Sequence, residues 1–177
     1  MQEADTTPCA ERHSFLMAAA LQPDPRFMAE AIRLATENVT SGRGGPFGAV
    51  IVRDGEIVAR GANQVTASND PTAHAEVTAI RNACAALGTY VLERCIVYTS
   101  CEPCPMCLAA IYWARCEAIF YGNCAADAAK IGFDDQFLYQ ELCKPLSERS
   151  LPTVRLLPEE AWESFAAWQQ SPFKVEY

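Results

Sequence analysis

Residues 95–121 read CIVYTSCEPCPMCLAAIYWARCEAIFY and predict a strand, a helix and a second strand in direct succession. The apolar runs 95–99 and 118–121 have the length and composition of buried strands. Between them, Pro103 predicts the start of a helix, because proline is favoured in the first helical turn, where its missing N–H is not needed. We expect this helix to run to about Ala114. The segment therefore predicts an α/β protein.

The sequence on the N-terminal side of this segment predicts a helix, a hairpin and a second helix. Each helix is expected to begin at an Asp-Pro pair, since Asp caps helices and Pro fits their first turn. Asp54-Gly55 predicts the tight turn of the hairpin. The expected elements are a helix over 24–39, strands over 49–52 and 57–59, and a helix over 70–87.

The C-terminal part predicts one or two short helices within 124–143, an edge strand at Thr153–Leu156 and an amphipathic helix over 158–170. Strands that alternate with helices after an initial hairpin are typical of layered α/β proteins. We therefore predict a three-layer α/β/α fold with a mixed sheet of about five strands.

Composition narrows the classes of function. The chain has 177 residues, half of them hydrophobic and a fifth charged, which suits one globular domain. No apolar run approaches the roughly 20 residues of a membrane helix, so we expect no membrane span. The net charge is -8, and the 14 Lys and Arg residues are scattered. Because nucleic-acid-binding proteins concentrate basic residues, we expect no nucleic-acid partner.

The nine cysteines are an odd number, and most lie in apolar segments, which disfavours a disulfide framework. The chain begins with the acidic stretch Met1–Asp5, whereas a secretory signal peptide begins with positive charge. We therefore expect a cytoplasmic protein in a reducing compartment.

Two motifs predict a metal centre: Thr72-Ala-His74-Ala-Glu76 and Cys104-Pro-Met-Cys107. Positions 104 and 107 share one face of a helix, so two thiolates there can bind one metal ion. They also lie in the first helical turn, where the helix dipole favours negative sulfur. His74 is the expected third ligand. Two cysteines and one histidine leave the fourth position of a tetrahedral zinc for water, as in catalytic sites.

Glu76 is predicted to be catalytic rather than a ligand. On a helix, residues 74 and 76 point in different directions, so both cannot bind the same ion. Zinc lowers the pKa of its water to about 7. A carboxylate beside the open position can then move a proton from that water to a leaving amine.

Other interpretations of these cysteines remain open. Cys104-Pro-Met-Cys107 alone also fits a thioredoxin-like redox pair. Cys101 extends the run to C-x2-C-x2-C, as in iron–sulfur proteins, but position 111 is Ile where the bacterial cluster pattern has a fourth Cys. Cys101 could instead complete a structural zinc site, which would make the chain a non-catalytic interaction domain.

The order H-x-E followed by P-C-x-x-C is the signature of zinc-dependent nucleobase deaminases. With Gly45–Val50, Asp70–Glu76, Ile111–Ala114 and Gly132–Asp135, it resembles the cytidine/deoxycytidylate deaminase superfamily, and within it most closely the bacterial guanine deaminases. The resemblance covers about residue 24 to the C-terminus. It implies the cytidine-deaminase-like fold, one zinc ion per subunit, and hydrolysis of guanine to xanthine and ammonia.

The resemblance also implies roles for single residues. Phe47 would stack on the base, Trp113 would wall the pocket, and Asn63 would hydrogen-bond the purine edge. Asp135 would accept a hydrogen bond from the base, and the backbone N–H of Ala75 would lie near the reacting oxygen. Without the family pattern, the preferred interpretation is that Phe47 and Trp113 are core residues and Asp135 is an exposed helix cap. Within this superfamily, guanosine or cytosine deamination and tRNA adenosine deamination are alternatives.

The resemblance further implies a homodimer in which the C-terminal segment crosses to the partner and brings Tyr177 into the partner's pocket. The sequence pattern predicts an N-terminal extension of residues 1–22, a zinc deaminase domain of 23–157, and a C-terminal helix and tail of 158–177.

Overall fold

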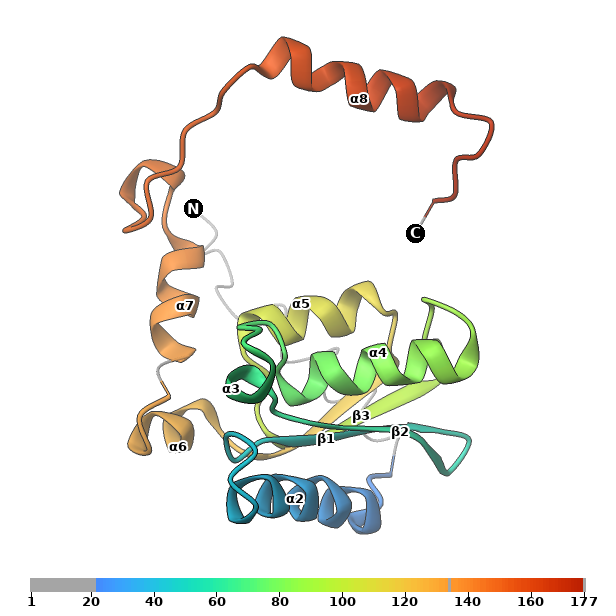
Figure 1. Ribbon diagram of the computed structural model, residues 1–177, viewed down its shortest axis with the longest axis vertical. Helices are drawn as coiled ribbons and strands as arrows, with labels where there is room; N and C mark the ends of the chain where they lie inside the picture. The colour runs from blue at the N-terminus through green and yellow to red at the C-terminus, as the bar shows by residue number, and fades with distance from the viewer. Residues whose placement is uncertain (1–21, 134, 177) are drawn as a thin grey trace, which may run out of the picture.

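The computed structural model describes residues 22–133 and 135–176 and has a sheet with helices on both faces (Figure 1). The sheet contains β1 (Gly48–Arg53), β2 (Glu56–Ala62), β3 (Cys95–Cys101) and β4 (Ala118–Asn123), in the order β2-β1-β3-β4. The strand β1 pairs antiparallel with β2 and β3, whereas β3 and β4 are parallel. The predicted α/β/α fold with a mixed sheet is confirmed.

The hairpin between β1 and β2 turns at Asp54-Gly55, as predicted. Both residues have positive φ, 52° and 80°, which is the backbone geometry of the tight turns that match strand twist. Gly supplies the second of these conformations without steric cost.

The strand β1 lies at the centre of two hydrophobic clusters. Its Ala49 and Ile51 pack with α4 (Ala75–Leu87) and α5 (Pro105–Trp113), whereas Val50 and Val52 pack with α2 (Pro25–Thr40). Successive side chains of a strand point to opposite faces, so a strand buried on both faces is apolar throughout. In Figure 1, α2 lies below the sheet and α4 and α5 lie above it.

One predicted helix begins later than expected. Asp70-Pro71 was expected to begin a helix, but α4 begins at Ala75 and residues 71–72 form a turn. The Asp70 carboxylate accepts hydrogen bonds from the Thr72 backbone N–H and hydroxyl, which stabilise this turn. The short helix α3 (Val65–Ser68) was not predicted.

The C-terminal part extends away from the sheet. It contains α6 (Ala125–Lys130), α7 (Asp135–Cys143), a 3-10 turn η1 (Leu146–Glu148) and α8 (Pro158–Gln170). Figure 1 shows α8 standing apart from α4 and α5, with the chain after it returning towards them.

The predicted edge strand at Thr153–Leu156 is absent from the described sheet, which has four strands rather than about five. Val154 is 85% exposed, and the segment extends between η1 and α8 without pairing to a strand. A strand needs a neighbour for its backbone N–H and C=O groups, and this segment meets none within the described chain.

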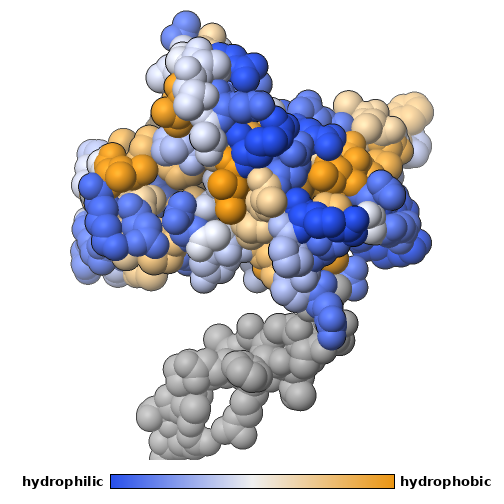
Figure 2. Space-filling view, turned by 90° about the horizontal axis from the view of Figure 1, so that it is seen from below, coloured by the Kyte–Doolittle hydropathy of each residue, from blue (hydrophilic) through white to orange (hydrophobic). Residues whose placement is uncertain are grey.

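Residues 1–21, which make up most of the predicted N-terminal extension, and Tyr177 lie outside the described residues. Figure 2 shows the molecule from the α2 side, where hydrophilic residues surround scattered hydrophobic patches. Among the described helices, none combines the length and apolar character that crossing a membrane requires.

Candidate active site

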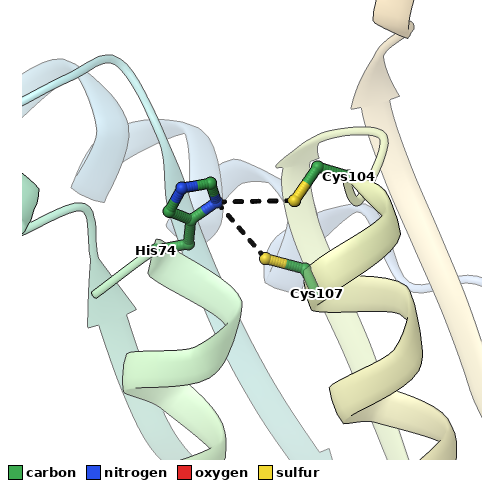
Figure 3. A group of neighbouring side chains, drawn as sticks. All are labelled: His74, Cys104 and Cys107. Carbon is green, nitrogen blue, oxygen red and sulfur yellow. Dashed lines mark hydrogen bonds between the residues drawn. The ribbon is translucent and has the colours of Figure 1, made fainter. Parts of the chain in front are cut away.

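Three predicted ligands meet where α4 and α5 begin (Figure 3). His74 is the N-cap residue of α4 and Cys104 is the N-cap residue of α5, while Cys107 lies in the first turn of α5. The Nδ1 atom of His74 lies 3.6 Å from Sγ of Cys104 and 3.5 Å from Sγ of Cys107. The three donor atoms all lie within 4.8 Å of one another.

The side chains of both N-cap residues belong to the metal group and do not cap their own helices. N-cap side chains commonly bond a backbone N–H of the first turn, but neither His74 nor Cys104 does so. The first-turn N–H groups of α4 and α5 therefore contribute their positive ends to the same region. This field favours thiolates and other negative groups at the site.

The distances fit a tetrahedral zinc ion. With Zn–S near 2.3 Å, Zn–N near 2.1 Å and a tetrahedral angle, a sulfur and a nitrogen ligand lie about 3.6 Å apart. The two S···N distances, 3.6 and 3.5 Å, agree with that value. Two thiolates and an imidazole also suit zinc better than magnesium or calcium, which prefer oxygen ligands.

The two thiols of the group differ in how readily each loses its proton. A hydrogen bond from Cys107 lowers the pKa of Cys104 to about 4, and the same contact raises the pKa of Cys107. The hydrogen bond with Cys104 raises the pKa of His74. A divalent cation would replace the shared proton and hold both sulfur atoms as thiolates.

Cys101 does not join the group. Its buried thiol donates a hydrogen bond to the backbone carbonyl of Cys124, 3.9 Å away, and burial raises its pKa to about 11. Among the described residues, the only His, Cys, Asp and Glu set placed to hold a metal is His74, Cys104 and Cys107. This arrangement favours a site with three protein ligands over one closed by Cys101.

Glu76 lies beside the ligands in the first turn of α4. It is 5% exposed, and its Oε1 accepts a hydrogen bond of 3.1 Å from the hydroxyl of Thr99 on β3. Burial raises the pKa of this carboxyl group. The bond to Thr99 fixes the orientation of the carboxyl group at the edge of the metal group.

These residues face a cavity of about 520 Å³, a volume typical of small-molecule sites. Predicted residues that line it are Phe47, Asn63, His74, Glu76, Cys104 and Asp135. Phe47 packs edge-to-face against Phe133, with ring centroids 4.8 Å apart. Asn63 lies directly after β2, and Asp135 is the first residue of α7. The structure thus brings together predicted residues from five separate segments.

Two predicted substrate-binding residues, Trp113 and Ala75, do not line this cavity, and a third lies outside the described residues. Trp113 is 62% exposed at the far end of α5 from Cys104, where it lines a second cavity with Trp168 and Tyr90. Ala75 is fully buried in the first turn of α4 and is not part of the cavity lining. Tyr177 lies outside the described residues.

Other residues that line or support the cavity were not predicted from the sequence. Gly44, Gly45 and Glu102 line it, and the buried Asn38 lies behind the first two. Glu102 is the residue between Cys101 and Pro103 in the cysteine motif, so its position could have indicated a role. Asn38 carries no such signal, because it lies in a helix with no metal or catalytic motif.

Residues 21–123 match the family described as the cytidine and deoxycytidylate deaminase zinc-binding region. The chain belongs to this deaminase family. The matched range includes all three ligands and Glu76, so the group at the start of α4 and α5 lies within the family's zinc-binding region.

Individual members of the family show how specific the likeness is. The chain is 58% identical to guanine deaminase of Bacillus subtilis over 151 residues, which are 85% of this chain and 97% of that protein. The crystal structure of a Bacillus subtilis guanine deaminase superimposes with a TM-score of 0.85 at 56% identity, covering 88% of this chain and 99% of that chain. A tRNA-specific adenosine deaminase of Agrobacterium fabrum is 42% identical over 98 residues, 55% of this chain and 64% of that protein.

Proposed function

We propose that this deaminase hydrolyses guanine to xanthine and ammonia, as a step in purine breakdown or salvage. The observation that carries the proposal is the 58% identity to Bacillus subtilis guanine deaminase across nearly all of that protein. A cavity that joins an aromatic face, an amide and a carboxylate to the metal group supports it.

In this proposal zinc, when bound, supplies water of lowered pKa at neutral pH. Glu76 moves the protons: its carboxylate takes one from the attacking water and delivers it to the departing amino group. The bond from Thr99 holds that carboxylate in place. Its burial keeps bulk water from competing for the proton.

The other walls would hold the base. The Phe47 ring offers a stacking surface, and its contact with Phe133 restricts its motion. The Oδ1 atom of Asn63 accepts weak hydrogen bonds from the backbone N–H groups of Gly45 and Val65, each 3.4 Å long. This orientation leaves the amino end of the Asn63 amide as the donor towards a purine. Asp135 would accept from an N–H group of the base.

The test is ammonia release from guanine, guanosine, cytosine, adenine and tRNA, with metal analysis of the same sample. Guanine should give equal amounts of xanthine and ammonia, at one zinc per chain. Glu76→Gln should keep the zinc and lose about 1,000-fold in kcat, because general acid–base catalysis contributes 10²–10⁴-fold. A non-catalytic zinc domain predicts no turnover by either form, and inosine formation in tRNA would instead support the tRNA deaminase alternative.

The cavity lining disfavours that alternative. It includes the carboxylates of Glu76, Glu102 and Asp135, and the described residues that line it include no Lys or Arg. Phosphates are usually bound by basic side chains, so this cavity suits a free base better than a nucleotide or a tRNA loop.

We also propose that two copies form a dimer by exchanging residues 158–177, while residues 23–157 form the deaminase domain. No residue of α8 is buried, and its large side chains Trp162, Phe165 and Trp168 are exposed. Exposed apolar patches on this scale mark interaction surfaces. Tyr112 and Trp113 on α5 offer a further exposed aromatic surface on the domain itself.

The position of the C-terminal tail supports its exchange between two copies, rather than its insertion into the cavity of its own chain. The hydroxyl of Tyr90 donates to the backbone carbonyl of Glu176 at 3.5 Å, beyond the C-terminal end of α4. His74 lies at the other end of this helix, whose 13 residues span about 20 Å. A terminal residue that completes the cavity would therefore come from the other copy.

Deleting Phe173–Tyr177 should leave zinc content unchanged and lower guanine turnover by about 100-fold, the usual scale for misplaced substrate. Mixing the deleted chain with the Glu76→Gln chain sharpens this test. In an exchanged dimer, the intact tail of one chain completes the cavity that retains Glu76 in the other, so activity should return. Unchanged turnover after deletion would remove the tail from the site, and an inactive mixture would argue against exchange.

We further propose that the enzyme works in the reducing cytoplasm. All eight cysteines in the described part of the chain are free thiols, and two of them are needed as metal ligands. Oxidation of Cys104 and Cys107 would remove both thiolates from the site, which is consistent with a reducing compartment.

A further inference from the structure

Asn38 lies behind the substrate side of the cavity and not in its lining. It belongs to the last turn of α2 and is 3% exposed. Its Nδ2 donates two hydrogen bonds to backbone carbonyls, one of 2.9 Å to Gly45 and one of 2.7 Å to Asn63. Because both partners are acceptors, the orientation of the amide is defined by its surroundings.

The two carbonyl groups belong to the two segments that carry the proposed base-binding residues. The backbone N–H of Asn63 donates to the carbonyl of Phe47 at 3.1 Å, and the N–H of Phe47 donates to the carbonyl of Gly45 at 2.9 Å. One side chain thus connects the segment of the stacking residue Phe47 with the segment of the amide residue Asn63. A further bond, from the backbone N–H of Arg43 to the carbonyl of Asn38, holds the loop before them.

The packing around Asn38 is as tight as its hydrogen bonding. A Cβ atom added at Gly44 would lie 2.4 Å from the carbonyl oxygen of Asn63 and 2.8 Å from Nδ2 of Asn38. Real Cβ atoms essentially never make such short contacts. The glycine therefore lets the loop close directly onto the Asn38 amide, which leaves no room for water between them.

We propose that Asn38 is a positioning residue that sets the separation of Phe47 and Asn63 and thereby the affinity for the purine base. The inference rests on the proposed deamination. Asn38 touches neither the metal ligands nor the cavity, so it acts through the two backbone carbonyls alone. Its loss takes a donor from the buried carbonyl of Asn63 and one of two donors from the carbonyl of Gly45, which loosens the Gly45 loop against the Asn63 segment.

The test is Asn38→Asp, which keeps the shape of the side chain but removes both N–H donors and places a carboxylate against two carbonyl oxygens. Asn38→Ser, smaller and neutral, serves if the first variant folds poorly. The matched control is Asn82→Asp, because Nδ2 of Asn82 donates to the backbone carbonyl of Arg60 at 2.8 Å on the exposed side of α4. Steady-state kinetics are measured on the folded, zinc-loaded fraction of each variant.

The variants at Asn38 should raise KM for guanine at least tenfold and change kcat less than threefold, with one zinc per chain retained. Asn82→Asp should leave both constants unchanged. A variant at Asn38 with unaltered KM, with kcat lowered as much as KM is raised, or with zinc lost during purification would overturn the inference. Wild-type protein that releases no ammonia from guanine would instead overturn the proposed function. The same kinetics on whichever base of the panel it does deaminate then decide the role of Asn38.

Discussion

The sheet domain, residues 22–133, and the C-terminal arm, residues 135–176, use hydrophobic residues in opposite ways. In the domain, Val50, Ile51 and Val97 are fully buried between the sheet and its helices. In the arm, neither α7 nor α8 buries a single described residue, although their side chains include the large aromatic groups of Trp162 and Phe165. The sheet domain therefore buries its apolar side chains within one chain, whereas the large apolar side chains of the arm stay exposed, as the proposed exchange requires.

The residues of the candidate site also come from both regions. All three metal ligands and Glu76 come from the well-packed domain, from the first turns of α4 and α5. Asp135, at the start of the arm, is the arm's one described contribution to the cavity lining. In the proposed function, the chemistry depends on the ends of two packed helices, and recognition of the base depends in part on Asp135 of α7, a helix with no buried residue.

The largest expected effect of a single methyl group is at Gly61, where the domain is most tightly packed. A Cβ there would lie 2.2 Å from the carbonyl oxygen of Ala75 and 2.5 Å from the backbone nitrogen of Ala79, both in α4. Gly61→Ala should push α4 off β2 and lower the free energy of unfolding by about 3 kcal/mol. Because α4 carries His74 and Glu76, zinc affinity and kcat should fall as well.

Gly48→Ala is the matched control. Its Cβ would lie 2.3 Å from the carbonyl oxygen of Ala31 and 2.7 Å from the nitrogen of Ala35, both in α2, on the other face of the sheet. Both variants should lose stability in chemical denaturation, but only Gly61→Ala should lose zinc affinity in a chelator competition. Equal zinc affinity in the two would show that the position of α4 does not control the metal group.

The sequence predicted the domain well because its signals are local. An Asp-Gly turn, apolar strand runs and proline near helix starts are each decided within a few residues, and the elements lie close to the predicted positions except for α4, which begins at Ala75 rather than at Asp70-Pro71. The metal group was predictable because His74, Cys104 and Cys107 have a spacing with chemical meaning. Asn38 was not predictable, since its role comes from contacts with residues 7 and 25 positions away in the chain.

The packing of the C-terminal arm was harder to predict, because it depends on contacts that are not local in the sequence. Its amphipathic helix was predicted over 158–170, and α8 covers that range. The pattern does not reveal which surface the apolar side of the helix meets, because periodicity describes one helix and not its partner. Thr153–Leu156 has a strand-like pattern but no neighbouring strand within the described chain, and Trp113 lies at the end of α5 away from the metal.

The smallest expected effect is at Phe165 on the arm, measured against Ile51 in the core. Ile51→Ala should cost about 3–4 kcal/mol at any protein concentration, because it opens a cavity in a closed cluster. Phe165 is 63% exposed and meets Trp162 edge-to-face at 5.6 Å, so Phe165→Ala should cost less than about 0.5 kcal/mol when the chain is dilute and monomeric. At high concentration the same change should weaken the dimer, which denaturation at two concentrations and sedimentation can separate. If Phe165→Ala instead costs as much as Ile51→Ala in the monomer, then α8 packs on its own domain in solution and the contrast between domain and arm disappears.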